Sequence, residues 1–295
     1  MILLCTGIMM IACAIDTPDD GNTGFPAFPG GDTLVVLTWN LQLFPKSGIS
    51  SINYVEDAIL DMKPDIIAFQ EISSEFAFQQ LADRLEHYSR HRGDGGGDWG
   101  LAYFYVDSLI ALDTSIYEIY TDRSRPFPRP PLVMEARWQG EKVVIINNHL
   151  KAGGDGAIDP DNNWDQERRR QEAVQLLDDY IKSHFDSENV VLLGDLNDEL
   201  TDPEGRNVFQ SFIDDSLNYR FTDMHIAEGS RLLWSYPSYP SHLDHIMISN
   251  ELFENHYETQ TVLYDTYLDG RWSEYHNYIS DHRPVSVSLV IEGDQ

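Results

Sequence analysis

Cysteine is almost absent from this sequence, and both examples, Cys5 and Cys13, lie within the first 13 of its 295 residues. The rest of the chain therefore cannot form a disulfide bond and offers no thiolate ligands to a metal. Small disulfide-stabilised domains and zinc-thiolate modules are thereby excluded, although a location outside the cytoplasm is not. Internal repeats and low-complexity blocks are also absent after Thr33, which favours a single globular domain.

Positive charge is scarce. The chain has 20 Lys and Arg against 49 Asp and Glu, a formal net charge of −29. A uniformly acidic surface repels nucleic acids and anionic membranes. One stretch departs from this balance, because residues 121–170 contain nine basic and eight acidic residues. Most of the acids are explained by a solvated acidic surface, but this middle segment is a candidate for contact with an anionic substrate.

No apolar run is long enough to cross a bilayer, which takes about 20 residues. Residues 1–13 are apolar and short, as expected of a signal peptide, and residues 10–13 resemble a lipobox ending at Cys13. No basic residue precedes the run, and Met10 stands where Leu is usual. We expect a cell-envelope lipoprotein anchored to the membrane through Cys13, with ordinary secretion or a misassigned start as alternatives. Residues 14–32, rich in Pro, Gly and Asp, are predicted to be a flexible linker.

Periodicity divides residues 33–292 into alternating strands and helices of one domain. Several predicted strand pairs lack a helix between them, which indicates a mixed sheet, or two sheets, with helices outside. The predicted strands are 33–39, 65–69, 99–107 paired with 108–111, a hairpin of 132–138 and 142–147, 189–193, 243–249 and 284–291; the predicted helices are 54–62, 75–87 and 166–183.

Polar side chains stand at the ends of these apolar runs, where rigid strands can aim them into a shared cleft. Each one alone has an ordinary structural explanation, such as a turn, a helix cap or a buried histidine. Their combination is more informative. The clusters are Trp39-Asn40-Leu41, Phe69-Gln70-Glu71, Asn148-His149-Leu150, Gly194-Asp195-Leu196-Asn197, His242-Leu243-Asp244-His245 and Ser280-Asp281-His282.

In this order the clusters resemble the endonuclease/exonuclease/phosphatase superfamily, the deoxyribonuclease I-like fold, over about residues 34–289. The resemblance implies an α/β four-layer sandwich, in which two mixed sheets pack face to face with helices outside. It also implies metal-dependent phosphoester hydrolysis. A bacterial secreted or lipid-anchored member, monomeric in solution, fits the sequence best.

The resemblance further implies a role for each cluster. Glu71 would be the main ligand of Mg²⁺ (or Mn²⁺), with Asn40 and Asp281 nearby, and hard cations prefer such oxygen ligands. Catalytic roles fall to His149, Asp195, Asn197, Asp244 and His282. Asp195 would orient or deprotonate water, Asn197 would donate to a phosphoryl oxygen, Asp244 would pair with His282, and His149 would lie near the leaving oxygen.

One position departs from some relatives, which have an acid two residues after the position of Asn40; here it is Gln42. Asp98 is a candidate to orient His149. Residues 155–165 resemble a calcium loop only loosely and fit a helix N-terminal cap better.

Substrate contacts are expected from the basic segment, namely Arg125, Arg129 and Lys151, with Arg123 and Arg168–Arg170 as further candidates. An unliganded surface loop is the alternative for these residues. His149 and the Arg-rich loop favour nuclease-like phosphodiester hydrolysis of DNA or RNA. The charge of −29 favours the alternative, a phosphatase or phosphodiesterase acting on an inositol phosphate, a phospholipid headgroup or a nucleotide.

Overall fold

The computed structural model describes residues 25–291, so the predicted signal peptide, the lipidation site and residues 14–24 of the predicted linker lie outside it. Two side chains of the predicted linker, Phe25 and Phe28, pack against the apolar cluster beside the first sheet. No helix among the described residues is long and apolar enough to cross a bilayer.

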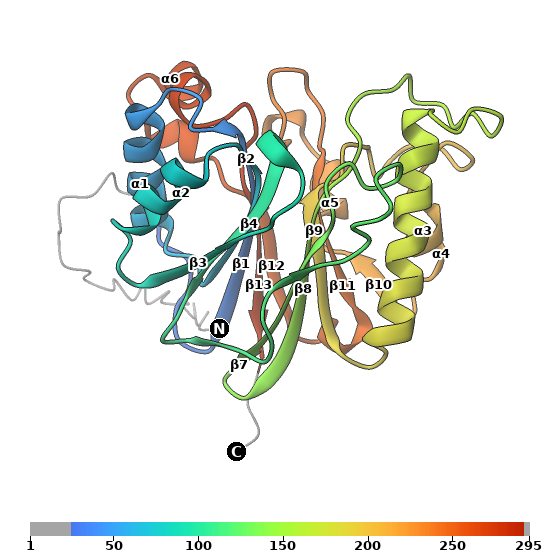
Figure 1. Ribbon diagram of the computed structural model, residues 1–295, viewed down its shortest axis with the longest axis horizontal. Helices are drawn as coiled ribbons and strands as arrows, with labels where there is room; N and C mark the ends of the chain where they lie inside the picture. Colours follow the sequence, from blue (N-terminus) through green and yellow to red (C-terminus); the bar gives the residue numbers. More distant parts are fainter. Residues whose placement is uncertain (1–24, 292–295) are drawn as a thin grey trace, which may run out of the picture.

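Two mixed sheets form the centre of the described domain (Figure 1). The first has the spatial order β12 (His256–Thr261), β13 (Val285–Val290), β1 (Thr33–Phe44), β2 (Ile66–Ile72), β4 (Gly100–Val106) and β3 (Tyr88–Arg92). The second has the order β10 (Tyr219–Phe221), β11 (Asp244–Ser249), β9 (Asn189–Asp195), β8 (Glu141–His149), β7 (Leu132–Trp138) and β5 (Ile110–Leu112), with β6 (Tyr117–Glu118) also paired to β7.

Helices cover the outer face of each sheet, so the four-layer prediction is confirmed (Figure 1). On the first sheet lie α1 (Ile49–Met62), α2 (Glu75–Ala82) and α6 (Arg271–Tyr278). On the second lie α3 (Gln166–His184), α4 (Gln210–Asp214) and α5 (Met224–Ala227). Short 3₁₀ helices are η1 (Gly97–Trp99), η2 (Arg231–Leu233), η3 (Asn250–Leu252) and η4 (Tyr264–Tyr267).

Three apolar clusters separate the layers. The central one joins the two sheets, with Val36 and Ala68 from the first sheet and Ile145 and Leu193 from the second. The other two fill the spaces between each sheet and its helices. Because strands β1, β2, β8 and β9 are covered on both faces, they are almost continuously apolar.

Three local predictions were wrong. Helix α1 begins at Ile49, five residues before the predicted start. Helix α2 ends at Ala82, and the remainder of the predicted helix is a turn leading to β3, whose side chains are all half-buried and give no periodic signal. Strand β5 pairs with β7 of the second sheet, and not with β4, because the turn after Val106 carries the chain from one sheet to the other.

Candidate active site

Strand register places three polar side chains side by side at the ends of three neighbouring strands of the second sheet. His149 of β8 is opposite Asp195 of the parallel strand β9, and Asp195 is opposite Asp244 of the antiparallel strand β11. At the adjoining end of the first sheet, Asn40 of β1 is paired with Gln70 of β2, and Gln70 is followed by Glu71. Face-to-face packing of the sheets therefore brings together residues from distant parts of the chain.

Asn40 connects the two sheets at the site. Its Nδ2 donates to Glu71 Oε1 at 3.2 Å and to Asp195 Oδ2 at 2.9 Å. Glu71 has a φ of +62°, in an irregular part of the β1–β2–β4 ladders that follows Phe69. A positive φ is unfavourable for a residue other than glycine and is characteristic of functional sites. Here it accompanies a break in the pairing at the residue that faces Asn40.

Asp281 joins this group through Gln42, whose importance the sequence did not reveal. Gln42 Nε2 donates to Asp281 Oδ2 at 2.8 Å, and its backbone N–H donates to Asn40 Oδ1 at 2.9 Å. The only signal was its position two residues after Asn40. Glu71, Asn40 and Asp281 are thus linked through the side-chain amides of Asn40 and Gln42, and the two carboxylates of this group fit a hard divalent cation.

His282 and Asp244 form a buried pair. His282 Nδ1 lies 2.7 Å from Asp244 Oδ2, while its Nε2 is 3.9 Å from Asp195 Oδ2. Burial lowers the pKa of His282, but the carboxylates of Asp244 and Asp195 outweigh it and raise that pKa to about 10. The ring is therefore cationic at neutral pH.

Tyr236 lies beside this imidazole, and the sequence did not single it out. Its ring centroid is 4.7 Å from that of His282. Burial, followed by the charges of Asp281, Asp195 and Glu71, raises the pKa of the phenol. Tyr236 is therefore a neutral neighbour of the charged groups, supplied by the loop before β11.

Asp195 and His149 form the opposite side of the site. Burial and the nearby acids Asp244 and Glu71 raise the pKa of Asp195 to about 7, although His282 and Asn40 act against this. Burial lowers the pKa of His149 well below its ordinary value, and Arg129 and other cations add to the effect. His149 is therefore neutral, and its Nε2 lies 3.4 Å from Asp195 Oδ2.

The candidate role of Asp98 was wrong. His149 Nδ1 has no hydrogen-bond partner among the described residues, and Asp98 is exposed in η1. Asn197 does lie beside Asp195: its backbone N–H donates to Asp195 Oδ1 at 3.1 Å, and its φ is +56°. Its Nδ2 also donates to Leu150 O at 3.3 Å, which fixes the amide at the edge of the site.

Close packing behind Asp195 makes Gly194 a sensitive position. Its φ is +140°, and a Cβ atom there would lie 1.9 Å from the backbone oxygen of Asn148. Because the contact is with the backbone of β8, a side chain cannot rotate away from it.

We expect Gly194→Ala to lower the free energy of unfolding by about 3 kcal/mol or more, since it combines strain with a backbone clash. Urea unfolding would measure this loss. Gly205→Ala is the matched control, because Gly205 has a φ of +85° but nothing within 4 Å of the added Cβ. Similar losses for the two variants would show that the contact with Asn148 is unimportant.

Two groups of buried acids and histidines among the described residues converge closely enough to hold a metal ion. One is Asp195, Asp244 and His282, in which the charged imidazole disfavours a metal. The other is Asp223, His242 and His245. His245 Nδ1 lies 2.6 Å from Asp223 Oδ2 and its Nε2 lies 2.8 Å from Asp198 O. Both partners accept, so both ring nitrogens carry protons.

The second group is therefore a buried ion pair, and it predicts a pH-dependent stability. Burial alone would lower the pKa of His245, but Asp223 raises it; burial alone would raise the pKa of Asp223, but the histidines lower it. The contribution of His245 to the free energy of unfolding is complete below about pH 6.5, and it is lost as pH rises through the raised pKa of this histidine. The contribution of Asp223 to the free energy of unfolding is present above the ordinary pKa of an aspartate and is lost in acid.

We expect Asp223→Asn to destabilise the fold by about 3–5 kcal/mol at pH 6, because it leaves a buried imidazolium without its counterion. The loss should be smaller at pH 9, where the imidazolium can release its proton. Urea unfolding at both pH values tests this, with Asp186→Asn on the surface as the control. An equal loss at both pH values would contradict a charged His245.

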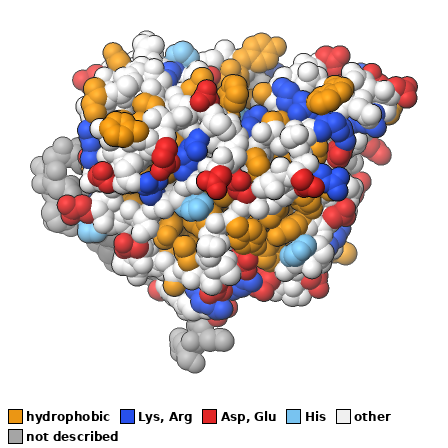
Figure 2. Space-filling view, in the orientation of Figure 1, with side chains coloured by type: hydrophobic (Ala, Val, Ile, Leu, Met, Phe, Trp, Pro, Cys, Tyr) orange, Lys and Arg blue, Asp and Glu red, His pale blue; other side chains and the backbone are white. Residues whose placement is uncertain are grey.

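The basic residues separate into two sets. Arg129, Lys151 and Arg169 line a pocket of about 460 Å³ that also contains Glu71 and His149. Arg125 does not line it, contrary to the prediction, because it pairs with Glu172 and donates to Asn163 O. Basic side chains gather over the start of α3 on the face in Figure 2, while acids are scattered elsewhere on it.

Neighbouring charged groups have structural roles. Arg170 is buried against Asp198 and Glu167, and its Nη1 donates to Lys151 O. Asp165 caps α3 by accepting from Arg168 N at 2.8 Å, as the helix-cap interpretation of residues 155–165 predicted.

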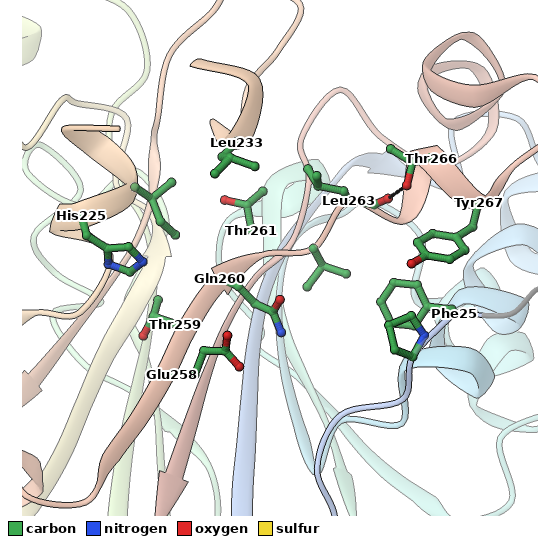
Figure 3. A pocket seen from close by; sticks show the side chains of 13 residues that line it. Phe25, His225, Leu233, Glu258, Thr259, Gln260, Thr261, Leu263, Thr266 and Tyr267 are labelled. Atoms are coloured by element: carbon green, nitrogen blue, oxygen red, sulfur yellow. Dashed lines mark hydrogen bonds between the residues drawn. The ribbon is translucent and has the colours of Figure 1, made fainter. Parts of the chain in front are cut away.

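A second pocket runs along the edge strand β12 and contains none of the groups above (Figure 3). His225 lies at one end, Phe25 and Tyr267 lie at the other, and Leu233 and Thr261 lie between them. It is separate from the candidate active site.

Comparisons with solved structures agree with this architecture. Zebrafish (D. rerio) TDP2 complexed with a single-stranded DNA product matches with a TM-score of 0.65 and 14% identity, over 87% of this chain and 98% of that one. The human nocturnin catalytic domain with bound sulfate has a TM-score of 0.63 and 19% identity, over 87% and 92%. A Bacteroides thetaiotaomicron endonuclease/exonuclease/phosphatase family protein has a TM-score of 0.58 and 17% identity, over 87% and 97%. At these identities the likeness shows the fold.

No curated protein sequence matches the chain significantly. A sequence model of the "Endonuclease/Exonuclease/phosphatase family" does match, over residues 37–282. That span runs from within β1 to His282 and includes every cluster of the site. The chain therefore belongs to the endonuclease/exonuclease/phosphatase family, whose members are phosphoester hydrolases.

Proposed function

We propose that this protein hydrolyses phosphodiester bonds with the help of Mg²⁺ (or Mn²⁺), in the manner of a nuclease. The observation that carries the proposal is the meeting of the Asp244–His282 pair with Asp195, Asn40 and Glu71 at one junction of two sheets. Phosphate ester cleavage needs neutralised non-bridging oxygens, an oriented water and a route for a proton. These residues provide for each need.

Glu71, Asn40 and Asp281 would hold the cation, because their side chains carry oxygen atoms and no sulfur or neutral imidazole. When bound, the cation would neutralise charge on the phosphate. His282 supplies a fixed positive charge on the other side, and the Asp244 carboxylate keeps it protonated and oriented. Asn197 would donate a hydrogen bond to a phosphoryl oxygen.

Asp195 is the candidate base, since a carboxyl group with a pKa of about 7 can accept a proton at neutral pH. In the hydrolysis, a bond forms between the water oxygen and phosphorus as the bond from phosphorus to the leaving oxygen breaks. The water proton passes to Asp195 and then to the leaving oxygen. Neutral His149 beside Asp195 would donate a hydrogen bond to that oxygen.

Two observations bear on the class of substrate, and they favour different substrates. The solved structure of TDP2 holds a single-stranded DNA product, which supports a nucleic acid as the substrate of this protein. A net charge of −29 favours a shorter or smaller phosphodiester, because a long polyanion meets more of the acidic surface. The second candidate is therefore a nucleotide, an inositol phosphate or a phospholipid headgroup.

A substrate panel tests the proposal directly. Plasmid DNA, single-stranded DNA, RNA, sphingomyelin and inositol phosphates are incubated at low salt with Mg²⁺ or Mn²⁺, with and without a chelator. We expect metal-dependent cleavage of DNA or RNA. Hydrolysis of the small phosphoesters alone would replace the nuclease with the second candidate, and turnover that survives the chelator would remove the metal from the mechanism.

A further inference from the structure

Three cations line one pocket without a direct ion pair among the described residues, in a chain that has a large excess of acids. The pocket is walled by Arg129, Lys151 and Arg169 together with Trp99. None of the three cations forms an ion pair within 4.0 Å among the described residues, whereas Arg170, on the same helix as Arg169, is paired twice. With 49 acids available, this lack of pairing requires an explanation.

Two of these cations are buried. Arg129 and Arg169 are each only 9% exposed. Arg129 Nη2 donates to Leu150 O at 2.8 Å, while its Nε has no partner. Arg169 Nε donates to Arg125 O at 2.6 Å, and Lys151 Nζ donates to Ala152 O at 2.6 Å. Carbonyl groups accept these hydrogen bonds without neutralising the charges.

Burial of unpaired charge has a visible electrostatic consequence. It lowers the pKa of Arg129 to about 10, against the attraction of Asp195 and Glu71. It also lowers the pKa of Lys151 and of Arg169, and neighbouring arginines add to both shifts. A buried charge is costly unless it is paired. A bound anion would provide the missing partner.

The pocket adjoins the site at the junction of the sheets and shares two of its residues. Glu71 and His149 line it, but Asn40, Asp195 and His282 do not. An anion between the three cations would therefore lie next to the phosphate held at the junction of the sheets. Trp99, with 48% of its surface exposed, offers a flat apolar face at the rim for the group that carries the anion.

We propose that Arg129, Lys151 and Arg169 bind a second phosphate of the substrate, a terminal phosphate one nucleotide away from the scissile diester. This inference rests on the proposed phosphodiesterase function. It makes the preferred substrate a short oligonucleotide with a phosphorylated end, and it reconciles phosphodiester chemistry with an acidic surface that disfavours long polyanions.

The test compares dinucleotides that differ by one phosphate: dTpdT, pdTpdT and dTpdTp, each with Mg²⁺. We expect one phosphorylated form to have a kcat/KM about 10²-fold above that of dTpdT, since one or two charge-assisted hydrogen bonds supply that factor. Lys151→Gln, Arg169→Gln and the double variant should reduce this preference to about threefold or less. Arg125→Gln is the control and should retain it.

Trp99→Ala should weaken binding of all three dinucleotides by a similar factor. Equal kcat/KM values in the wild type, or a preference that survives the double variant, would overturn the inference while leaving the phosphodiesterase intact. Failure to cleave any dinucleotide would contradict the nuclease proposal. The pocket is then judged by calorimetry with inorganic phosphate on metal-free protein: a Kd raised tenfold or more in Lys151→Gln supports the anion site, and an unchanged Kd overturns it.

Discussion

Glu71→Gln should lower kcat/KM about 10³-fold or more at a fixed Mg²⁺ concentration. The substitution preserves size but removes the carboxylate that faces Asn40, whose Nδ2 lies 3.2 Å from Glu71 Oε1. Metal neutralisation of a phosphate contributes several kcal/mol to the transition state, and each 1.4 kcal/mol corresponds to a factor of ten. Steady-state rates against Mg²⁺ concentration measure the loss, and calorimetry with the metal measures the affinity.

The matched control is Glu75→Gln. Glu75 lies at the start of α2, pairs with Arg90 and is exposed, so its replacement should leave both rate and metal affinity unchanged. Retention of wild-type metal affinity in Glu71→Gln would show that the cation is held elsewhere.

The second large effect concerns the Asp244–His282 pair, which should behave as one unit. We expect His282→Gln and Asp244→Asn each to lower kcat about 10²–10³-fold, as removal of one fixed electrostatic contact to the transition state does. Because Asp244 acts through His282, the double variant should be little worse than either single one. Single-turnover rates of the three variants complete the cycle.

His87→Gln is the control for this cycle, because His87 is exposed on the turn before β3. Circular dichroism and urea unfolding of each variant separate a loss of catalysis from a loss of folding. Additive effects in the double variant would mean that Asp244 has a role independent of the imidazole, which would contradict the pairing seen at 2.7 Å.

Much of the fold could be predicted from the sequence because its signals are local. The runs at 33–39, 65–69 and 189–193 are apolar throughout, as strands covered on both faces must be. The Gln139-Gly140 turn marks the β7–β8 hairpin. Strand β3 gave no such signal, and the strand predicted at 108–111, which corresponds to β5, was assigned the wrong partner. Both are short edge elements whose place depends on distant partners.

The candidate site was only partly visible for the same reason. Polar residues at strand ends indicated Asn40, Glu71, Asp195 and His282, since each end is a local feature. Gln42 and Tyr236 were missed because their roles depend on contacts with residues far away in the sequence.

The sequence by itself determined the family and the inventory of chemical groups, because both reside in short motifs and their order along the chain. Only the tertiary structure decided which groups touch. It showed that Asn40 faces both Glu71 and Asp195, that Arg125 has a counterion, and that Arg129 and Arg169 do not. Charge state and pairing depend on burial and on neighbours brought together by sheet packing, and neither quantity is local to a motif.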